Sequence, residues 1–221
     1  MEQLLSCMGG SIQVFINSVA ITAISVIGVV FLSTLTGYGF VRLYFYGKEL
    51  LYASLFILML IPDILLLAPT FILVKKLQLL DSWGALIFPY VAGGQIIGIF
   101  IMRNYIENLP KEIFEAVRMD GASEFQTFGS IIIPLTKPMM MTIAILTSVS
   151  VWNDYVWPMT TITNDQLRTV TIGLQFFTTQ YEVKTGYLMA ANVICSIPIL
   201  ILFMFGTRYF VQGVMSGAVK G

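Results

Sequence analysis

The sequence predicts an all-α membrane protein, a polytopic bundle of about five transmembrane helices. Hydrophobic residues make up 57% of the 221 residues and charged residues only 11%, whereas a soluble domain is about 25% charged. Long apolar runs also recur along the chain, close to the roughly 20 residues that a spanning helix needs. Because so few charged side chains cannot cover a water-facing surface, a soluble globular fold is excluded.

Each apolar run is predicted to be one span of a single transmembrane domain over 1–221. The predicted spans are 12–41, 50–74, 83–102, 131–151 and 187–210. The first run lacks the basic start of a secretory signal and is too long for its apolar region.

Basic residues set the predicted orientation, because Lys and Arg accumulate in cytoplasmic loops. One side of the bundle receives eight of the twelve basic residues and is therefore predicted to be cytoplasmic. Those eight are Arg42, Lys48, Arg103, Lys111, Arg118, Lys137, Arg208 and Lys220. The segment 103–130 and the C-terminus then face the cytoplasm, while the loop 152–186 and the N-terminus lie outside.

The segment after the third span is far more charged than its surroundings, with nine charged side chains between positions 103 and 137. Pro110 suits the first turn of a helix, and Gly121 suits a helix stop. Ser123 and Gln126 match a capping box that starts a second helix. The composition leaves open whether this helix pair packs on its own bundle or binds a soluble partner.

Enzymatic chemistry has little support in this chain. It contains no His, the commonest general base and metal ligand. Cys7 and Cys195 are far apart and form no metal-spaced pair. A Gly-rich phosphate loop is also missing, and a net charge of zero gives no basic excess for nucleic acid. We therefore predict no catalytic residue, metal site or cofactor in this chain.

The motif in the charged segment resembles a known family. The charged segment contains Glu115, Ala116 and Val117, then Gly121 and the run up to Pro134. This pattern resembles the EAA signature of ABC importer permeases. It departs from the signature at two positions, because Val117 replaces the second Ala and Ile133 replaces the Leu before the Pro. The run WNDYVWP from Trp152 and the YGFVR ending at Arg42 are similar to the sugar branch, which includes the maltose and glycerol-3-phosphate permeases. That branch usually has six helices, so the usual first helix is expected to be absent here.

The resemblance implies a type I ABC importer permease-like fold in the bacterial cytoplasmic membrane and a non-catalytic role. It implies a second permease subunit (usually a different chain), a dimer of ABC ATPase subunits that binds ATP and Mg, and an extracytoplasmic solute-binding protein. The implied ATPase-coupling residues are Glu115, Ala116, Val117, Asp120, Gly121, Ala122 and Pro134. Glu115 would pair with a groove of the ATPase, and Gly121 would allow the turn between the helices.

Residues of the solute pathway remain open to two interpretations each. Aromatic residues such as Trp152 form an interfacial belt or stack on sugar, with Asn153 or Asp154 bonding hydroxyls. Asp63 is a functional acid or a cap in a proline-broken stretch.

Two further polar residues lie within the spans. Gln95 lies between Gly94 and Gly98, a spacing that favours helix packing, and Asn192 lines a polar pathway or bonds a neighbouring helix.

A non-sugar ABC permease and a secondary carrier remain as alternatives to the sugar permease. The carrier would need internal repeats and central ionisable residues.

Overall fold

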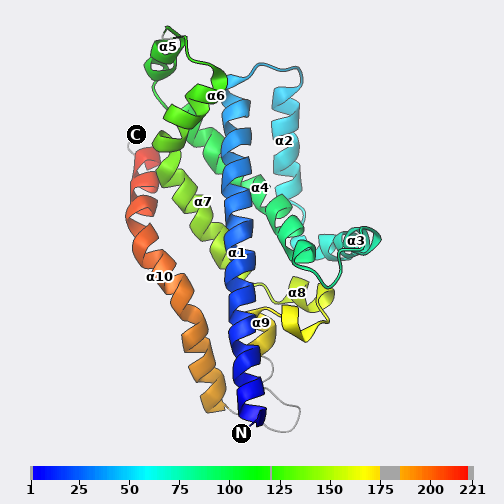
Figure 1. Cartoon of the computed structure of the whole chain (residues 1–221). Coiled ribbons are helices and arrows are strands. Elements are labelled where there is room, and N and C mark those ends of the chain that lie inside the picture. Colours follow the sequence, from blue (N-terminus) through cyan, green and yellow to red (C-terminus); the bar gives the residue numbers. More distant parts are fainter. Residues whose placement is uncertain (1, 120, 175–184, 219–221) are drawn as a thin grey trace. The chain divides into compact units, whose positions relative to one another are not determined.

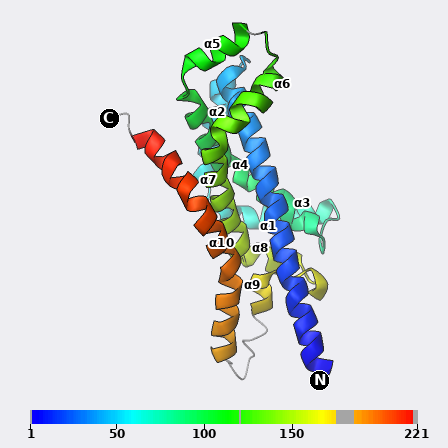
Figure 2. The same cartoon turned by 60° about the vertical axis from the view of Figure 1, so that its left-hand side comes forward.

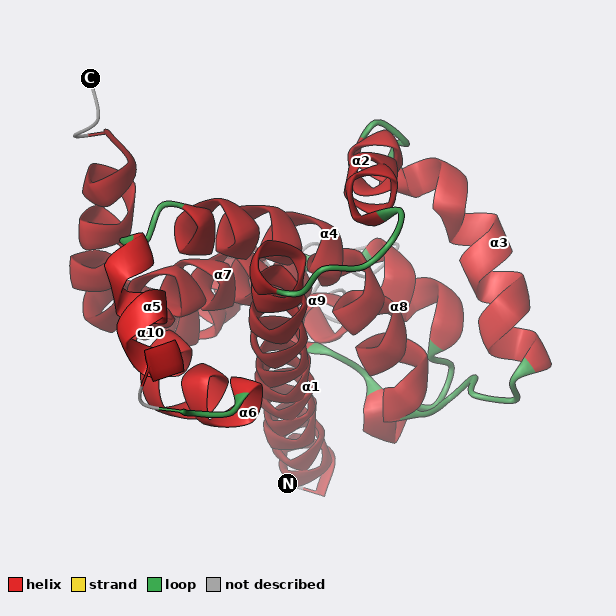
Figure 3. Cartoon of the chain, turned by 90° about the horizontal axis from the view of Figure 1, so that it is seen from above, coloured by secondary structure: helices red, strands yellow, loops and turns green. Residues whose placement is uncertain are grey.

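The computed structural model describes residues 2–119, 121–174 and 185–218, and all regular secondary structure in these ranges is helical (Figure 3). The predicted all-α membrane bundle is confirmed. The helices are α1 (Glu2–Arg42), α2 (Lys48–Met59), α3 (Asp63–Lys76), α4 (Trp83–Glu107), α5 (Lys111–Met119), α6 (Glu124–Thr127), a π-helix (Phe128–Ile132), α7 (Ile133–Asn153), α8 (Val156–Thr161), a 3-10 turn (Asp165–Leu167), α9 (Val170–Gly173) and α10 (Thr185–Ala218).

Within the described ranges, four helices are long and apolar enough to cross a membrane. They are Ile12–Arg42, Trp83–Glu107, Glu124–Asn153 and Met189–Gly206. The pair α2 and α3 is a fifth candidate, but its two helices are bent by 105° relative to each other.

This bend corrects the continuous span predicted over 50–74. α2 ends at Met59, and Pro62 is the residue that precedes α3. Proline has no N–H for the helical ladder, and it disfavours helical dihedral angles at the residue before it, Ile61. The apolar run is therefore divided into two helices.

The fourth predicted span begins earlier than position 131, because α6 continues into α7 through the π-helix. The N–H of Ile133 donates to the carbonyl of Phe128, five residues back. Pro134 follows in the first turn of α7 and is exposed. The wider turn thus lies directly before a residue that has no N–H to donate.

The chain forms two compact units, each described by itself below. The first unit comprises Met1–Val26, Pro62–Val91 and Thr147–Met204. The second comprises Ile27–Ile61, Ala92–Leu146 and Phe205–Gly221. The single permease domain over 1–221 stays a prediction.

The first unit has an apolar core around Trp157, which is 8% exposed. Leu86 and Val151 pack in the same cluster, with Ile21 from α1. The indole N–H of Trp157 donates to the carbonyl of Ala85 at 2.9 Å. This bond satisfies the only polar group of the side chain, so burial of the ring leaves no unpaired donor.

The second unit is held by close packing between α1 and α4. A Cβ at Gly98 would lie 2.7 Å from the Cβ of Ser33, and one at Gly94 would lie 2.6 Å from a methyl of Val29. On α1, a Cβ at Gly37 would lie 2.9 Å from the Cβ of Met102. Only glycine permits such an approach, so these positions pack helices together, as the spacing of Gly94 and Gly98 predicts.

Candidate functional site

The α5–α6 pair, defined as α5, α6 and the turn between them, lies beside the C-terminal end of α1 (Figures 1 and 2). Its first helix is amphipathic. Phe114 and Val117 are 5% and 9% exposed, whereas Glu115 and Ala116 are exposed. The signature is therefore divided between two faces: Val117 anchors the helix, while Glu115 and Ala116 are accessible to another molecule.

The turn of the α5–α6 pair has the local structure that its sequence predicts. Gly121 has a φ of +71°, a left-handed conformation that residues with a Cβ rarely adopt. The half-buried Ala122 donates its N–H to the carbonyl of Val117 at 3.3 Å. The predicted coupling residue Asp120 lies outside the described residues.

The second helix of the pair begins with the predicted capping box. The backbone N–H of Ser123 donates to the side chain of Gln126 at 2.8 Å. The backbone N–H of Gln126 donates to the Ser123 hydroxyl at 3.3 Å. These reciprocal bonds pair two of the backbone donors that a helix start leaves open.

Two large apolar side chains of the pair were not predicted as site residues. Met119 ends α5 and Phe125 lies in α6, and each is 87% exposed. α6 has only four residues, too few for periodicity to indicate which face is covered, and Met119 is apolar but ends α5 outside the face of Phe114 and Val117. Glu115, Ala116, Met119 and Phe125 are thus exposed side chains of the pair, and we call these four residues the docking face.

In the first unit, Asp154 organises the corner after α7. One carboxylate oxygen accepts the N–H groups of Val156 and Trp157 at 3.1 and 3.4 Å, at the start of α8. The other accepts the hydroxyl of Tyr90 at 2.8 Å. A carboxylate at a helix start is favoured by the open N–H groups and the helix dipole.

The neighbours of Asp154 differ in exposure. Trp152 belongs to α7 and not to a loop: it is 7% exposed, and its indole N–H donates to the carbonyl of Cys195 at 3.0 Å. Asn153 is exposed and donates to the carbonyl of Val149 at 2.8 Å. The predicted loop 152–186 also contains α8, the 3-10 turn and α9 within its described part.

The remaining predicted pathway residues lie on different elements. Asp63 is the first residue of α3 and is exposed. Asn192 is exposed on α10, and its carbonyl accepts the Ser196 hydroxyl at 2.8 Å. In the second unit, the amide nitrogen of Gln95 lies 3.5 Å from the carbonyl of Val29. The amide oxygen of Gln95 is buried without a hydrogen-bond partner among the described residues.

Asp81 was not predicted as a site residue, although it joins two segments of the first unit. Its carboxylate accepts the N–H and hydroxyl of Thr163 at 2.5 and 2.6 Å and the N–H of Asn164 at 2.8 Å. The hydroxyl of Thr163 and these backbone N–H groups hold the pKa of Asp81 below its usual value. The partners are more than 80 residues apart, so the sequence gives no local signal for this contact.

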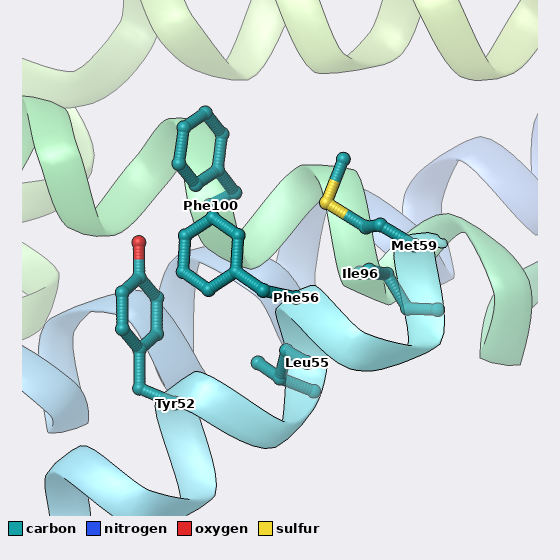
Figure 4. A pocket seen from close by; sticks show the side chains of 6 residues that line it. All are labelled: Tyr52, Leu55, Phe56, Met59, Ile96 and Phe100. Atoms are coloured by element: carbon teal, nitrogen blue, oxygen red, sulfur yellow. The ribbon is translucent and has the colours of Figure 1, made fainter. Parts of the chain in front are cut away.

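The second unit also has a small groove between α2 and α4 (Figure 4). It is lined by Tyr52, Leu55, Phe56, Met59, Ile96 and Phe100. Sugar recognition needs several converging hydrogen-bond groups. The tyrosine hydroxyl is the one such side-chain group in this lining, so the groove does not have the chemistry of a sugar site.

Comparison with known proteins identifies the family. Residues 29–216 match the family described as the binding-protein-dependent transport system inner membrane component. The chain belongs to this family. It is therefore a multi-pass inner-membrane permease, and the predicted resemblance to ABC importer permeases is confirmed.

Named relatives support the same assignment. The arabinooligosaccharides transport system permease protein AraQ of Halalkalibacterium halodurans is 35% identical, over 94% of this chain and 74% of the relative. The trehalose/maltose transport system permease protein MalG of Thermococcus litoralis is 33% identical, over 93% of this chain and 74% of the relative.

Two solved structures share the fold. A bacterial ABC transporter involved in the import of the acidic polysaccharide alginate matches with a TM-score of 0.72 and 24% identity, over 90% of this chain and 74% of that chain. The MetNI methionine ABC transporter matches with a TM-score of 0.69 and 14% identity, over 96% of this chain and 98% of that chain.

Proposed function

We propose that this permease forms part of the membrane path for a sugar or oligosaccharide, and that it binds a separate ATPase through the α5–α6 pair. The docking face is the observation that carries the second half of this proposal. Phe114 and Val117 anchor α5 inward, which leaves Glu115, Ala116 and Met119 exposed on α5, and Phe125 is exposed on α6. Aromatic and Met side chains are enriched where proteins bind one another.

The cargo is inferred from the relatives, two of which are named for arabinooligosaccharide and for trehalose and maltose transport. The fold does not distinguish cargoes, because the methionine transporter shares it. Asp63, Gln95 and Asn192 stay candidates for the pathway. We propose that Trp152 and Asp154 support the pathway by packing, and that the exposed Asn153 is the member of that run that can contact solute.

The remaining parts of the proposal concern assembly. The chain would pair with a second, different permease subunit, and an extracytoplasmic binding protein would deliver solute. A dimer of ATPase subunits would bind ATP and Mg, and this chain would perform no catalytic step. The α5–α6 pair and the C-terminus would face the cytoplasm, where basic residues accumulate.

The cargo can be tested with the complete transporter in proteoliposomes. The binding protein encoded beside this chain is loaded with arabinooligosaccharide, trehalose, maltodextrin or methionine, and the rate of ATP hydrolysis is measured. A sugar importer predicts stimulation by at least one carbohydrate and none by methionine. Stimulation by the amino acid alone would replace sugar with a non-sugar cargo and leave the permease assignment intact.

A further inference from the structure

The last turns of α1 contact both helices of the α5–α6 pair. Tyr38 and Arg42 are four residues apart, so they lie on one face of α1. Tyr38 contacts α6 and Arg42 contacts α5, on the two sides of the Gly121 turn. All these residues belong to the second unit.

Tyr38 holds the second helix of the pair. Its hydroxyl donates to the carboxylate of Glu124, the first residue of α6. Its ring lies 5.6 Å from the ring of Phe128, measured between centroids. Tyr38 is 4% exposed whereas Glu124 is exposed, so the tyrosine side of the bond is buried, and the bond belongs to the stronger class because its acceptor is charged.

Arg42 holds the first helix. Its guanidinium carbon lies 4.3 Å from the centroid of the Phe114 ring. Its Nε is buried without a hydrogen-bond partner among the described residues, and its side chain also interacts with the Tyr38 hydroxyl, so both the Phe114 ring and Tyr38 hold the cation. A positive charge at the last turn of α1 is also favoured by the helix dipole.

The turn between the two helices is held by a backbone hydrogen bond from Ala122 to Val117 and not by side-chain packing at Gly121. A Cβ built at Gly121 would have no atom within 4 Å, so no neighbour packs against this residue. α1 is in contrast packed closely on α4 through Gly37, Gly94 and Gly98. The two contacts from α1 therefore connect each helix of the pair to a rigid part of the unit.

We propose that Tyr38 and Arg42 are positioning residues that make α5 and α6 move with α1 when the ATPase closes. This inference rests on the proposed ATPase docking. Without these contacts the ATPase would still bind the docking face. Its closure would then displace the α5–α6 pair about Gly121 and would not move α1. ATP hydrolysis would then continue while solute import falls.

The test uses the complete transporter in proteoliposomes and measures ATP hydrolysed per solute imported. Tyr38→Phe keeps the ring against Phe128 and removes the hydroxyl, and Arg42→Gln removes the cation. Tyr38→Phe is expected to raise the ratio about tenfold, the size of losing one hydrogen bond to a charged group, and Arg42→Gln about fivefold, the size of losing one cation–π contact. Arg42→Lys keeps a cation over the ring and is expected to restore most of the coupling.

A matched control is Tyr105→Phe. The Tyr105 hydroxyl donates to the carbonyl of Leu135 at 3.2 Å, which joins α4 to α7 without touching the pair. This variant loses one hydrogen-bonded tyrosine hydroxyl as Tyr38→Phe does, at a half-buried residue, and its ratio is expected to stay within about twofold of wild type. Tyr38→Phe combined with Glu124→Ala is expected to be no worse than the worse single variant, because the two substitutions remove the same hydrogen bond.

Co-purification in the same preparations separates this inference from the function on which it rests. If the unchanged chain fails to retain the ATPase, the proposed docking is wrong. If the ATPase is retained and Tyr38→Phe and Arg42→Gln change the ratio no more than Tyr105→Phe does, the positioning role is overturned. If a variant does not assemble, the other one and Arg42→Lys decide the outcome.

Discussion

At the scale of single residues, carboxylates hold the corners of the first unit. Asp154 illustrates this, because it caps the start of α8 and accepts the Tyr90 hydroxyl. The side chain of its neighbour Asn153 donates to the carbonyl of Val149 within its own helix. The two residues are adjacent in the predicted sugar-binding run, yet their structural roles differ.

The two neighbours make a matched pair of variants. Asp154→Ala is expected to destabilise the protein by about 2 kcal/mol, because it removes a helix cap and leaves a half-buried tyrosine hydroxyl without its partner. Asn153→Ala is expected to cost less than about 0.5 kcal/mol, as for an ordinary exposed site. Thermal unfolding in detergent measures both. Equal midpoints for the two variants would contradict the capping role of Asp154. In proteoliposomes, weaker stimulation of ATP hydrolysis by solute in Asn153→Ala alone would support contact between Asn153 and solute.

Asp81 gives a prediction about pH. Its pKa is lowered in the folded protein from the usual value of 3.8, so its contribution to stability is fully present above about pH 4. This contribution is lost as the pH falls through that value toward the folded pKa. Between about pH 5 and about pH 3, the thermal midpoint of wild type should therefore fall more than that of Asp81→Asn. Parallel curves for the two proteins would show that the carboxylate contributes nothing.

At the scale of elements, the turn of the α5–α6 pair depends on one backbone conformation. Gly121→Val is expected to strain the turn by about 1–2 kcal/mol, since a Cβ disfavours a left-handed φ. Gly129→Val is the control, because both positions have open space for a Cβ and only Gly121 has a positive φ. We expect Gly121→Val to assemble with the ATPase but to lose import. Normal import by this variant would contradict the role of the turn.

The elements also show what the sequence can predict. Apolar runs indicate where helices lie, and the Ser123 and Gln126 pattern predicts a capping box because its bonds are local. A proline-broken stretch at Asp63 was one of two interpretations, but the span predicted over 50–74 was continuous, because hydropathy records the length of an apolar run and not its direction. The contacts of Asp81 and Tyr38 join segments more than 80 residues apart, and no local pattern encodes such pairs.

At the scale of the whole molecule, the four long helices α1, α4, α7 and α10 each contribute residues to both compact units. The predicted ATPase-coupling residues that the structure describes all lie in the second unit, whereas Trp152, Asn153 and Asp154 lie in the first. The pathway candidate Gln95 lies in the second unit as well, so the residues that separate cleanly from the docking face are Trp152, Asn153 and Asp154, and variants in the first unit serve as controls for the docking face.

The measurement that tests the central claim most directly is co-purification of the ATPase with the tagged permease. Wild type, Glu115→Lys and Phe125→Ser are compared with Asp165→Lys, which reverses an exposed carboxylate in the first unit whose surface ion pair contributes little to stability. We expect wild type and Asp165→Lys to retain the ATPase in stoichiometric amounts, and the two docking-face variants to lose it while keeping the second permease. Retention of the ATPase by both docking-face variants, or its absence from wild type, would contradict the account.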